Sequence, residues 1–195
     1  MKIILASRSG VRKEILEKNE IDCDVEASNV DEDEVKVAML NESATPTLIS
    51  KNLAELKANK VSNKNPDKIV LGADSVIDLE GELISKPKSR KEALEILQKL
   101  NGKKHQLISS VCISKNGSMI WHHTDKSHLI MKKLKEKEII NYLDKIRTEI
   151  LLAYGVYQIE ADGKSLFESI KGDKDSIMGL PMKQIINYIK NYRNK

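Results

Sequence analysis

The feature that most constrains this chain is a single carboxylate, Asp74, inside the apolar run formed by residues 69–77. A short apolar run of this kind predicts a strand buried inside a sheet. An ionised side chain there is costly unless its charge is used. One interpretation is a general base or metal ligand at the end of a buried strand, where α/β sheets gather ligands. The other is an aspartate that caps a turn at the end of the strand.

A second unusual stretch passes from a short apolar run directly into hydroxyls and cations. It predicts a strand followed by a helix, whose first N–H groups and positive dipole end can bind phosphate. Ser7 and Ser9 would add hydroxyl donors, and Arg12 and Lys13 would add positive charge. The stretch has neither the P-loop nor the dinucleotide-binding pattern, and read alone it is better explained as a capped helix with solvated cations. Together with the buried carboxylate, it suggests an enzyme that acts on phosphates.

The composition fits one compact domain over residues 1–195, with a net charge of +4 and a pI of about 8.9. A mildly basic surface could serve an anionic substrate or nucleic acid, so charge alone does not choose between them. Cys23 and Cys112 form no Cys-x-x-Cys pair, so we expect two reduced thiols in a cytoplasmic protein. No apolar stretch reaches the ~18 residues of a membrane span. The apolar run after Lys2 is too short for a signal peptide.

Strand and helix signals alternate along the chain. We expect strands at residues 2–6, 21–27, 69–77, 106–114, 118–131 and 166–170. We expect helices at residues 11–18, from Pro46 onward, from a capping box at 89–92 to residue 100, at 136–146 and at 182–192. The acidic stretch 29–34 and the polar stretch 59–68 are expected to be loops, and Asn116-Gly117 predicts a hairpin turn. This alternation predicts a mixed α/β fold.

Several other polar residues could contribute to chemistry, although each has a simpler explanation. Lys57 and Lys86 are single cations of the kind that solvent accommodates on any surface. Glu32 lies in the acidic stretch and could be a metal ligand or have no role. His123 and His128 are five residues apart on an expected strand, so they project to opposite faces and do not favour a metal site.

The order of the motifs is more specific than any one of them. The chain resembles the Maf family of nucleoside triphosphate pyrophosphatases from Ile3 to about Tyr188. The motifs that carry the resemblance are residues 5–13, 30–32, 53–58, 72–75, 86–87 and 179–181. The resemblance implies an α/β fold with an elongated, mixed central sheet flanked by helices and a cleft between two lobes. It also implies hydrolysis of nucleoside triphosphates, including non-standard or modified ones, to monophosphate and pyrophosphate with a divalent metal, Mg²⁺ or Mn²⁺.

The same resemblance assigns roles to individual residues. The catalytic Asp of the family falls on Asp74, which would act as the general base for metal-assisted attack by water. Glu32 and Asp74 would be the metal ligands. The phosphate-binding positions of the family fall on Ser7, Ser9, Arg12, Lys13, Lys57 and Lys86.

The resemblance links three positions to specificity, and the residues at two of them depart from the pattern of the family. Val11 replaces an Arg, Ser75 stands where Thr or Gln is usual, and Glu160 takes a place that is usually Gln or Glu. Members that prefer dTTP and UTP combine Thr with Gln, and members that act on 7-methyl-GTP combine Gln with Glu. Ser75 with Glu160 matches neither set, so the base preference stays open.

Two other functions stay open on the sequence. An inosine-triphosphate-type pyrophosphatase would release the same products, but its acidic motif, similar to Asp-Asp-Ser-Gly, is absent here. A basic nucleic-acid-binding module is supported by the pI and by Lys132, Lys133 and Lys135, but aromatics are only 4% and no recognition motif is visible. We therefore expect a nucleoside triphosphate as partner, no membrane and no nucleic acid, and leave a homodimer open.

Overall fold

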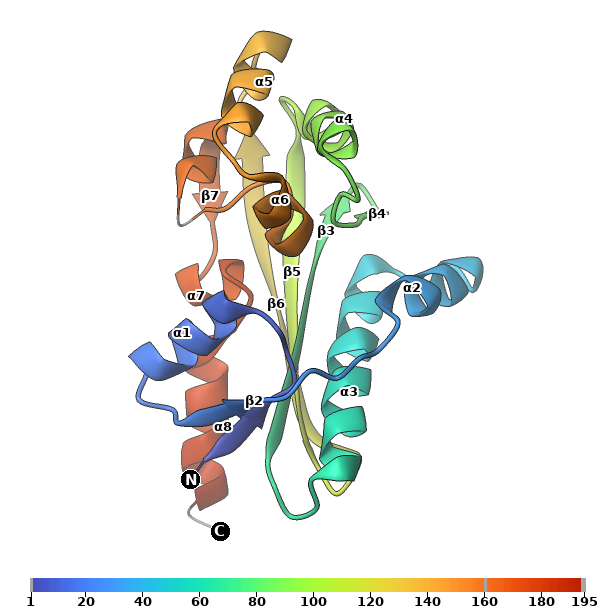
Figure 1. Ribbon diagram of the computed structural model, residues 1–195, viewed down its shortest axis with the longest axis vertical. Coiled ribbons are helices and arrows are strands. Elements are labelled where there is room, and N and C mark those ends of the chain that lie inside the picture. Colours follow the sequence, from blue (N-terminus) through green and yellow to red (C-terminus); the bar gives the residue numbers. More distant parts are fainter. Residues whose placement is uncertain (1, 160, 194–195) are drawn as a thin grey trace.

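The computed structural model describes residues 2–159 and 161–193 and is built around one seven-stranded sheet (Figure 1). The strands are β1 (Ile3–Leu5), β2 (Cys23–Val25), β3 (Val70–Leu79), β4 (Glu82–Ile84), β5 (Lys104–Lys115), β6 (Ser118–Met131) and β7 (Phe167–Lys171). The helices are α1 (Gly10–Lys18), α2 (Glu32–Asn41), α3 (Pro46–Lys64), α4 (Arg90–Leu100), α5 (Glu136–Asp144), α6 (Thr148–Tyr154), α7 (Lys174–Ile177) and α8 (Met182–Arg193), with a 3₁₀ turn η1 (Asp162–Leu166).

The sheet is mixed and elongated, as the resemblance implied. Its strand order is β2-β1-β3-β5-β6-β7, and β4 pairs with one end of β3. β1 runs parallel to β2 and β3, and the remaining pairs are antiparallel. The expected hairpin joins β5 to β6 through Asn116 and Gly117, whose φ angles are 52° and 77°. Both angles are positive, as a tight two-residue hairpin turn requires. The predicted fold class is confirmed.

The two largest hydrophobic cores of the described residues divide the molecule into two lobes that share the long central strands. The core of the lower lobe packs α1 and α8 against the sheet through residues such as Leu16, Leu71 and Ile185. The core of the upper lobe joins α4, α5 and β7 through residues such as Leu97 and Leu143. Figure 1 shows α1 and α8 on one side of the lower sheet and α3 on the other, with α4, α5 and α6 gathered at the opposite end. No helix in the described part of the chain is long and apolar enough to cross a membrane.

The edge of β3 is open at its middle, and this opening positions the site. β1 pairs with β3 through Val70 and Leu71, while β4 pairs with it from Ile77 to Leu79. Within the described residues, positions 72–76 of β3 therefore have a partner strand on the β5 side alone. An edge without a partner strand leaves backbone and side-chain groups free to meet something else. The opening lies where the two lobes meet.

The acidic stretch 29–34 was expected to be a loop, but α2 begins inside it at Glu32. Asp31 caps the helix, since its carboxylate accepts a hydrogen bond from the backbone N–H of Glu34 at 3.0 Å. Acidic residues in a first turn also suit the positive end of the helix dipole. The expectation was wrong because α2 buries no residue. It therefore lacks the apolar face by which an amphipathic helix is recognised in a sequence.

The polar stretch 59–68 was also expected to be a loop, yet α3 continues through Lys64. Its polar residues are used inside the protein: Ser62 is fully buried and its hydroxyl accepts a hydrogen bond from the N–H of Gly117 at 3.1 Å. Polar composition was the wrong guide here, because α3 packs against the hairpin through hydrogen bonds as well as through apolar contacts.

Candidate active site

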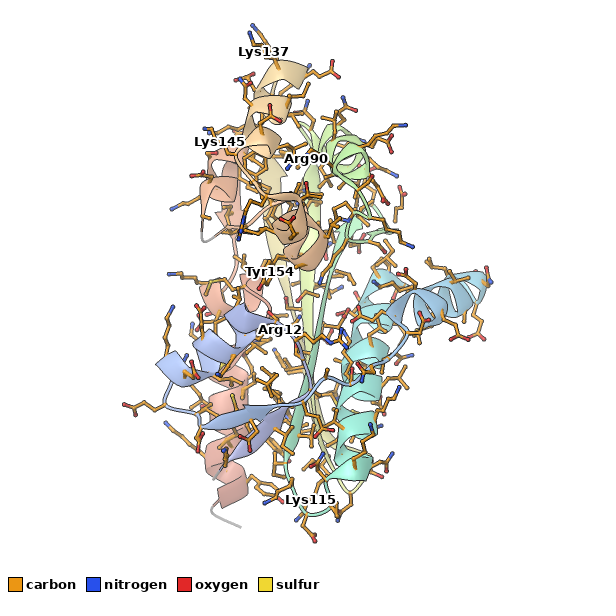
Figure 2. The ribbon with its side chains drawn as sticks, in the orientation of Figure 1. Arg12, Arg90, Lys115, Lys137, Lys145 and Tyr154 are labelled. Carbon is orange, nitrogen blue, oxygen red and sulfur yellow. The ribbon has the colours of Figure 1, made fainter. Side chains whose placement is uncertain are left out.

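A cleft of about 760 Å³ lies between the two lobes at the open edge of β3. Its walls come from the turn before α1, the start of α2, the middle of α3, the loop after β4 and the segment that follows α6. In Figure 2, Arg12 lies near the middle of the molecule and Tyr154 lies above it, on the side of the upper lobe. The expected cleft between two lobes is confirmed.

Asp74 is buried at the floor of this cleft, with only 4% of its surface exposed. Its position depends on Gly72, two residues earlier on the same face of β3. A Cβ on Gly72 would lie 2.2 Å from the carbonyl oxygen of Ala54 in α3, so only glycine allows α3 to approach this closely. The close approach brings the side chains of the middle of α3 within reach of Asp74.

Lys57 on α3 lies between the two predicted carboxylates. Its ammonium donates to Asp74 Oδ1 at 2.8 Å and pairs with Glu32 Oε1 at 2.7 Å. Burial raises the pKa of Glu32, but the attraction and hydrogen bond of Lys57, together with the charges of Lys36 and Lys86, outweigh it and hold the pKa of that carboxyl below its usual value. The fold thus brings together Glu32, Lys57 and Asp74 from three elements, α2, α3 and β3.

The second oxygen of Asp74, Oδ2, is buried and has no hydrogen-bond partner in the described structure. A buried carboxylate oxygen without a partner is costly, so this atom is suited to an additional ligand. No group of three or more Cys, His, Asp or Glu side chains that could hold a metal ion is found among the described residues. Two carboxylates nevertheless fit Mg²⁺ or Mn²⁺, because Mg²⁺ sites commonly use one or two carboxylates and complete the shell with water and phosphate oxygens.

Arg12 connects the lower lobe to β3. Its guanidinium donates to the carbonyl oxygens of Ala73 at 3.0 Å and Gly179 at 3.2 Å, and to the hydroxyls of Ser7 and Ser75, both at 3.2 Å. Burial lowers the pKa of Arg12, while the charges of nearby carboxylates oppose that shift. Most of its donors are already engaged by the protein, so Arg12 holds the wall of the cleft in place and adds positive charge to it.

The serines predicted to bind phosphate form the turn before α1. The Ser7 hydroxyl accepts from the backbone N–H of Ser9 at 3.2 Å, and the Ser9 hydroxyl caps α1 by accepting from Arg12 N–H at 3.4 Å. Helix geometry leaves the first N–H groups of α1, those of Gly10 and Val11, without partners inside the helix. Ser7, Ser9, Val11 and Arg12 all line the cleft, so its lower wall offers the donors that an anion requires.

The two remaining predicted cations are placed differently. Lys86 lines the cleft from the upper side, where its ammonium donates to the carbonyl oxygen of Ala153 at 2.8 Å. Burial by the cleft walls, followed by repulsion from Arg12, lowers the pKa of Lys86. Lys13 does not line the cleft in the described structure, and its ammonium lies 3.4 Å from Glu17 on the outer surface of α1.

The predicted specificity residues lie in part at the cleft. Val11 and Ser75 line it, and the Ser75 hydroxyl lies 3.1 Å from the hydroxyl of Ser109 on β5. Ser75 faces the side of Arg12, whereas Asp74 faces α3, because neighbouring residues of a strand project to opposite faces. Glu160 lies outside the described residues.

Several cleft residues were not singled out from the sequence, and three of them are polar side chains close to the predicted site or to α6. Lys36 lies one turn after Glu32, with its ammonium 3.9 Å from Glu32 Oε2, and it would have been noticed had α2 been predicted. The hydroxyl of Tyr154 lies 3.7 Å from the position that a Cβ of Gly10 would occupy, so α6 reaches toward α1 across the mouth of the cleft. Gln158 lies in the segment after α6. No local pattern in the sequence connects Tyr154 or Gln158 to the turn before α1.

Sequence relatives match this chain over nearly its whole length. A sequence model of the family described as Maf-like protein matches residues 2–192. The chain is 65% identical over 188 residues to a nucleoside triphosphate pyrophosphatase of Pelagibacter ubique, covering 96% of each chain. It is 41% identical over 180 residues to a 7-methyl-GTP pyrophosphatase of Bartonella quintana, covering 92% of this chain and 90% of that one. A solved structure of a HAM1 protein from Coxiella burnetii aligns with a TM-score of 0.44 at 14% identity, over 69% of this chain and 74% of that one.

Proposed function

The chain belongs to the Maf-like protein family and is a nucleoside triphosphate pyrophosphatase, and we propose that Asp74 is the general base of its reaction. The enzyme hydrolyses nucleoside triphosphates to the monophosphate and pyrophosphate. The observation that carries the proposal is that the two oxygens of the Asp74 carboxylate have different surroundings. Lys57 holds Oδ1 at 2.8 Å, while Oδ2 is buried without a partner in the described structure.

This arrangement suits a general base, because the carboxylate is oriented through one oxygen and free to act through the other. Oδ2 would accept a proton from a water molecule, and the oxygen of that water would form a bond to the α-phosphorus as the bond to the β-phosphate oxygen breaks. General-base catalysis of this kind typically contributes ~10²–10⁴-fold to a rate.

The positive groups of the cleft are arranged to hold the triphosphate and the departing pyrophosphate. Ser7, Ser9 and the start of α1 supply hydrogen-bond donors on the lower wall, and Lys86 supplies a cation on the upper wall. Fixed donors that meet developing negative charge lower the barrier without reorganising during the reaction. Lys13 has a smaller role in this arrangement, because it lies on the outer surface and pairs with Glu17.

Glu32 and Asp74 are the residues that would hold a divalent cation, Mg²⁺ or Mn²⁺. Such a cation, when bound, supplies positive charge to the phosphate oxygens. Lys57 contacts both carboxylates and limits their mutual repulsion when no cation is present. Metal dependence is therefore part of the proposal and is tested by comparing Mg²⁺, Mn²⁺ and excess chelator in the same assay.

The relatives include enzymes named for nucleoside triphosphates in general and for 7-methyl-GTP. We propose a modified or non-standard nucleotide among the substrates of this chain as well. Both Cys23 and Cys112 are free thiols, which supports a reducing compartment, and we propose the cytoplasm. A homodimer stays a prediction, which light scattering of the purified protein tests.

Hydrolysis in H₂¹⁸O tests the proposed bond cleavage. Attack on the α-phosphorus places ¹⁸O in the nucleoside monophosphate and none in pyrophosphate, and mass spectrometry distinguishes the two. Label in pyrophosphate would contradict the proposal. A panel that includes inosine triphosphate, pyrimidine and methylated nucleotides separates the inosine-triphosphate type of enzyme. Salt-sensitive DNA binding without release of pyrophosphate would instead favour a nucleic-acid-binding module.

A further inference from the structure

The upper end of the cleft is apolar, in contrast to the charged lower end. It is lined by Ile77, Ile84, Leu107, Val156 and Ile159. Ile77 lies two residues after Ser75 on β3. Its cross-strand neighbour on β5 is Leu107. If the triphosphate occupies the charged end, as the proposed function requires, the nucleobase reaches this apolar surface, which suits the flat face of a base.

One polar side chain at this end has an unmet hydrogen-bonding need. Gln158 lines the cleft, and its Nε2 is buried without a hydrogen-bond partner in the part of the chain that the structure describes. An amide nitrogen carries two N–H donors, and leaving them unpaired away from water is costly. Native proteins rarely keep such a group unless something else supplies the partner.

The backbone of Gln158 is held firmly in place. Its carbonyl oxygen accepts a hydrogen bond from Ala161 N–H at 3.1 Å. A Cβ on Gly163 would lie 2.5 Å from both the nitrogen and the carbonyl oxygen of Gln158, so the turn can pack this closely only with glycine. The preceding residue, Tyr157, is buried and hydrogen-bonded to His105 at 3.0 Å. The backbone from which the Gln158 side chain extends is therefore fixed in position, as a residue that recognises a ligand requires.

We propose that Gln158 reads the nucleobase by donating a hydrogen bond from Nε2 to a carbonyl oxygen on the edge of the base. This inference rests on the proposed function. Rotation about the last torsion of a glutamine side chain is easy and exchanges its oxygen with its nitrogen. Buried carbonyl oxygens without a full set of partners are tolerated better than buried N–H groups. The amide is therefore more stable with its oxygen inward and its N–H groups turned to the cleft.

A donor at this position distinguishes two classes of base. Guanine, hypoxanthine, uracil and thymine carry a carbonyl oxygen on the edge where adenine and cytosine carry an amino group. The carbonyl accepts the Gln158 N–H, whereas an amino group at the same place would bring two donors together. The preferred substrates are therefore nucleoside triphosphates whose base carries a carbonyl at that position.

The test compares pairs of substrates that differ at this one group, namely UTP with CTP and ITP with ATP. Steady-state pyrophosphate release is measured for the wild type, Gln158→Leu and Gln158→Glu. Ribose 5-triphosphate serves as a substrate without a base. Gln106→Leu is the matched control, because Gln106 Oε1 is also buried without a partner in the described structure but Gln106 does not line the cleft. Circular dichroism and thermal unfolding establish that each variant is folded.

We expect the wild type to favour UTP over CTP and ITP over ATP by about five- to tenfold in kcat/KM, the usual worth of one hydrogen bond. Gln158→Leu should remove this ratio, with less than about a twofold change on ribose 5-triphosphate. Gln158→Glu, which can only accept, should shift the ratio toward the amino bases. Gln106→Leu should keep the wild-type ratio.

The assignment is overturned if the wild type shows no preference, if Gln158→Leu keeps it, or if Gln106→Leu changes it equally. If Gln158→Leu does not fold, the base preference of Gln158→Glu tests the assignment. A shift toward CTP and ATP supports it, and no shift or a shift the other way overturns it. A wild type that releases pyrophosphate from no triphosphate at all, ribose 5-triphosphate included, would refute the proposed function itself.

Discussion

The ammonium of Lys57 lies 2.8 Å from Asp74 Oδ1, and both side chains are almost completely buried. The pair joins α3 to the open edge of β3, where the two lobes meet. Removing one partner of a buried ion pair is far more damaging than removing both, because the remaining charge is left buried without compensation.

Lys57→Met should lower the free energy of unfolding by roughly 3–5 kcal/mol, since Asp74 would keep a buried charge without its partner. The double variant Lys57→Met/Asp74→Asn should regain part of that loss. Urea denaturation followed by circular dichroism measures both. Lys13→Met is the matched control, and it should change stability little because the Lys13–Glu17 pair lies on the surface. Equal effects of the two lysine substitutions would contradict this account.

Arg12→Lys should reduce kcat/KM by at least about tenfold although it keeps the positive charge. A lysine cannot replace the planar fork that bonds Ala73, Gly179 and Ser75 at the same time. Steady-state kinetics measures the loss. The control is Lys13→Arg, since Lys13 does not line the cleft in the described structure and pairs with Glu17 on the surface, so kcat/KM should change little. A fully active Arg12→Lys enzyme would show that charge alone is needed.

Stability should fall in acid partly through Glu32. Burial raises the pKa of Glu32, but the pKa in the folded protein is below its ordinary value of 4.5 because Lys57, Lys36 and Lys86 together outweigh burial. A carboxyl of this kind stabilises the fold above the unfolded pKa and loses that contribution as the pH falls through its folded value. Below about pH 4.5, the wild type should therefore lose stability more steeply than Glu32→Gln. Urea titrations between pH 3 and pH 6 measure both slopes, and identical slopes would contradict the assignment.

Most of the fold could be predicted, because the apolar periodicity of its long strands and amphipathic helices is visible in the local sequence. The apolar run around Asp74 became β3, and Asn116-Gly117 became the hairpin turn. α2 could not be predicted, since it buries no side chain and so has no apolar periodicity. The end of α3 was missed because one of its buried positions is a serine, Ser62, whose hydroxyl is satisfied by the distant N–H of Gly117.

The site was predicted in part. Asp74, Glu32, Lys57 and Arg12 were proposed through the order of motifs along the chain, and the structure brings them together at one cleft. The role of Arg12 as a connection to Gly179 depends on a contact across 167 positions of sequence, which no local pattern reveals. The need of Gln158 for a partner likewise appears only when the packing around its amide is known.

The most direct test of the central claim is the rate of pyrophosphate release by Asp74→Asn, measured against the wild type at saturating substrate. Asparagine keeps the shape of the side chain but cannot accept the proton from water. We expect a folded protein whose kcat falls by ~10²–10⁴-fold. A folded Asp74→Asn enzyme with the wild-type rate would contradict the account.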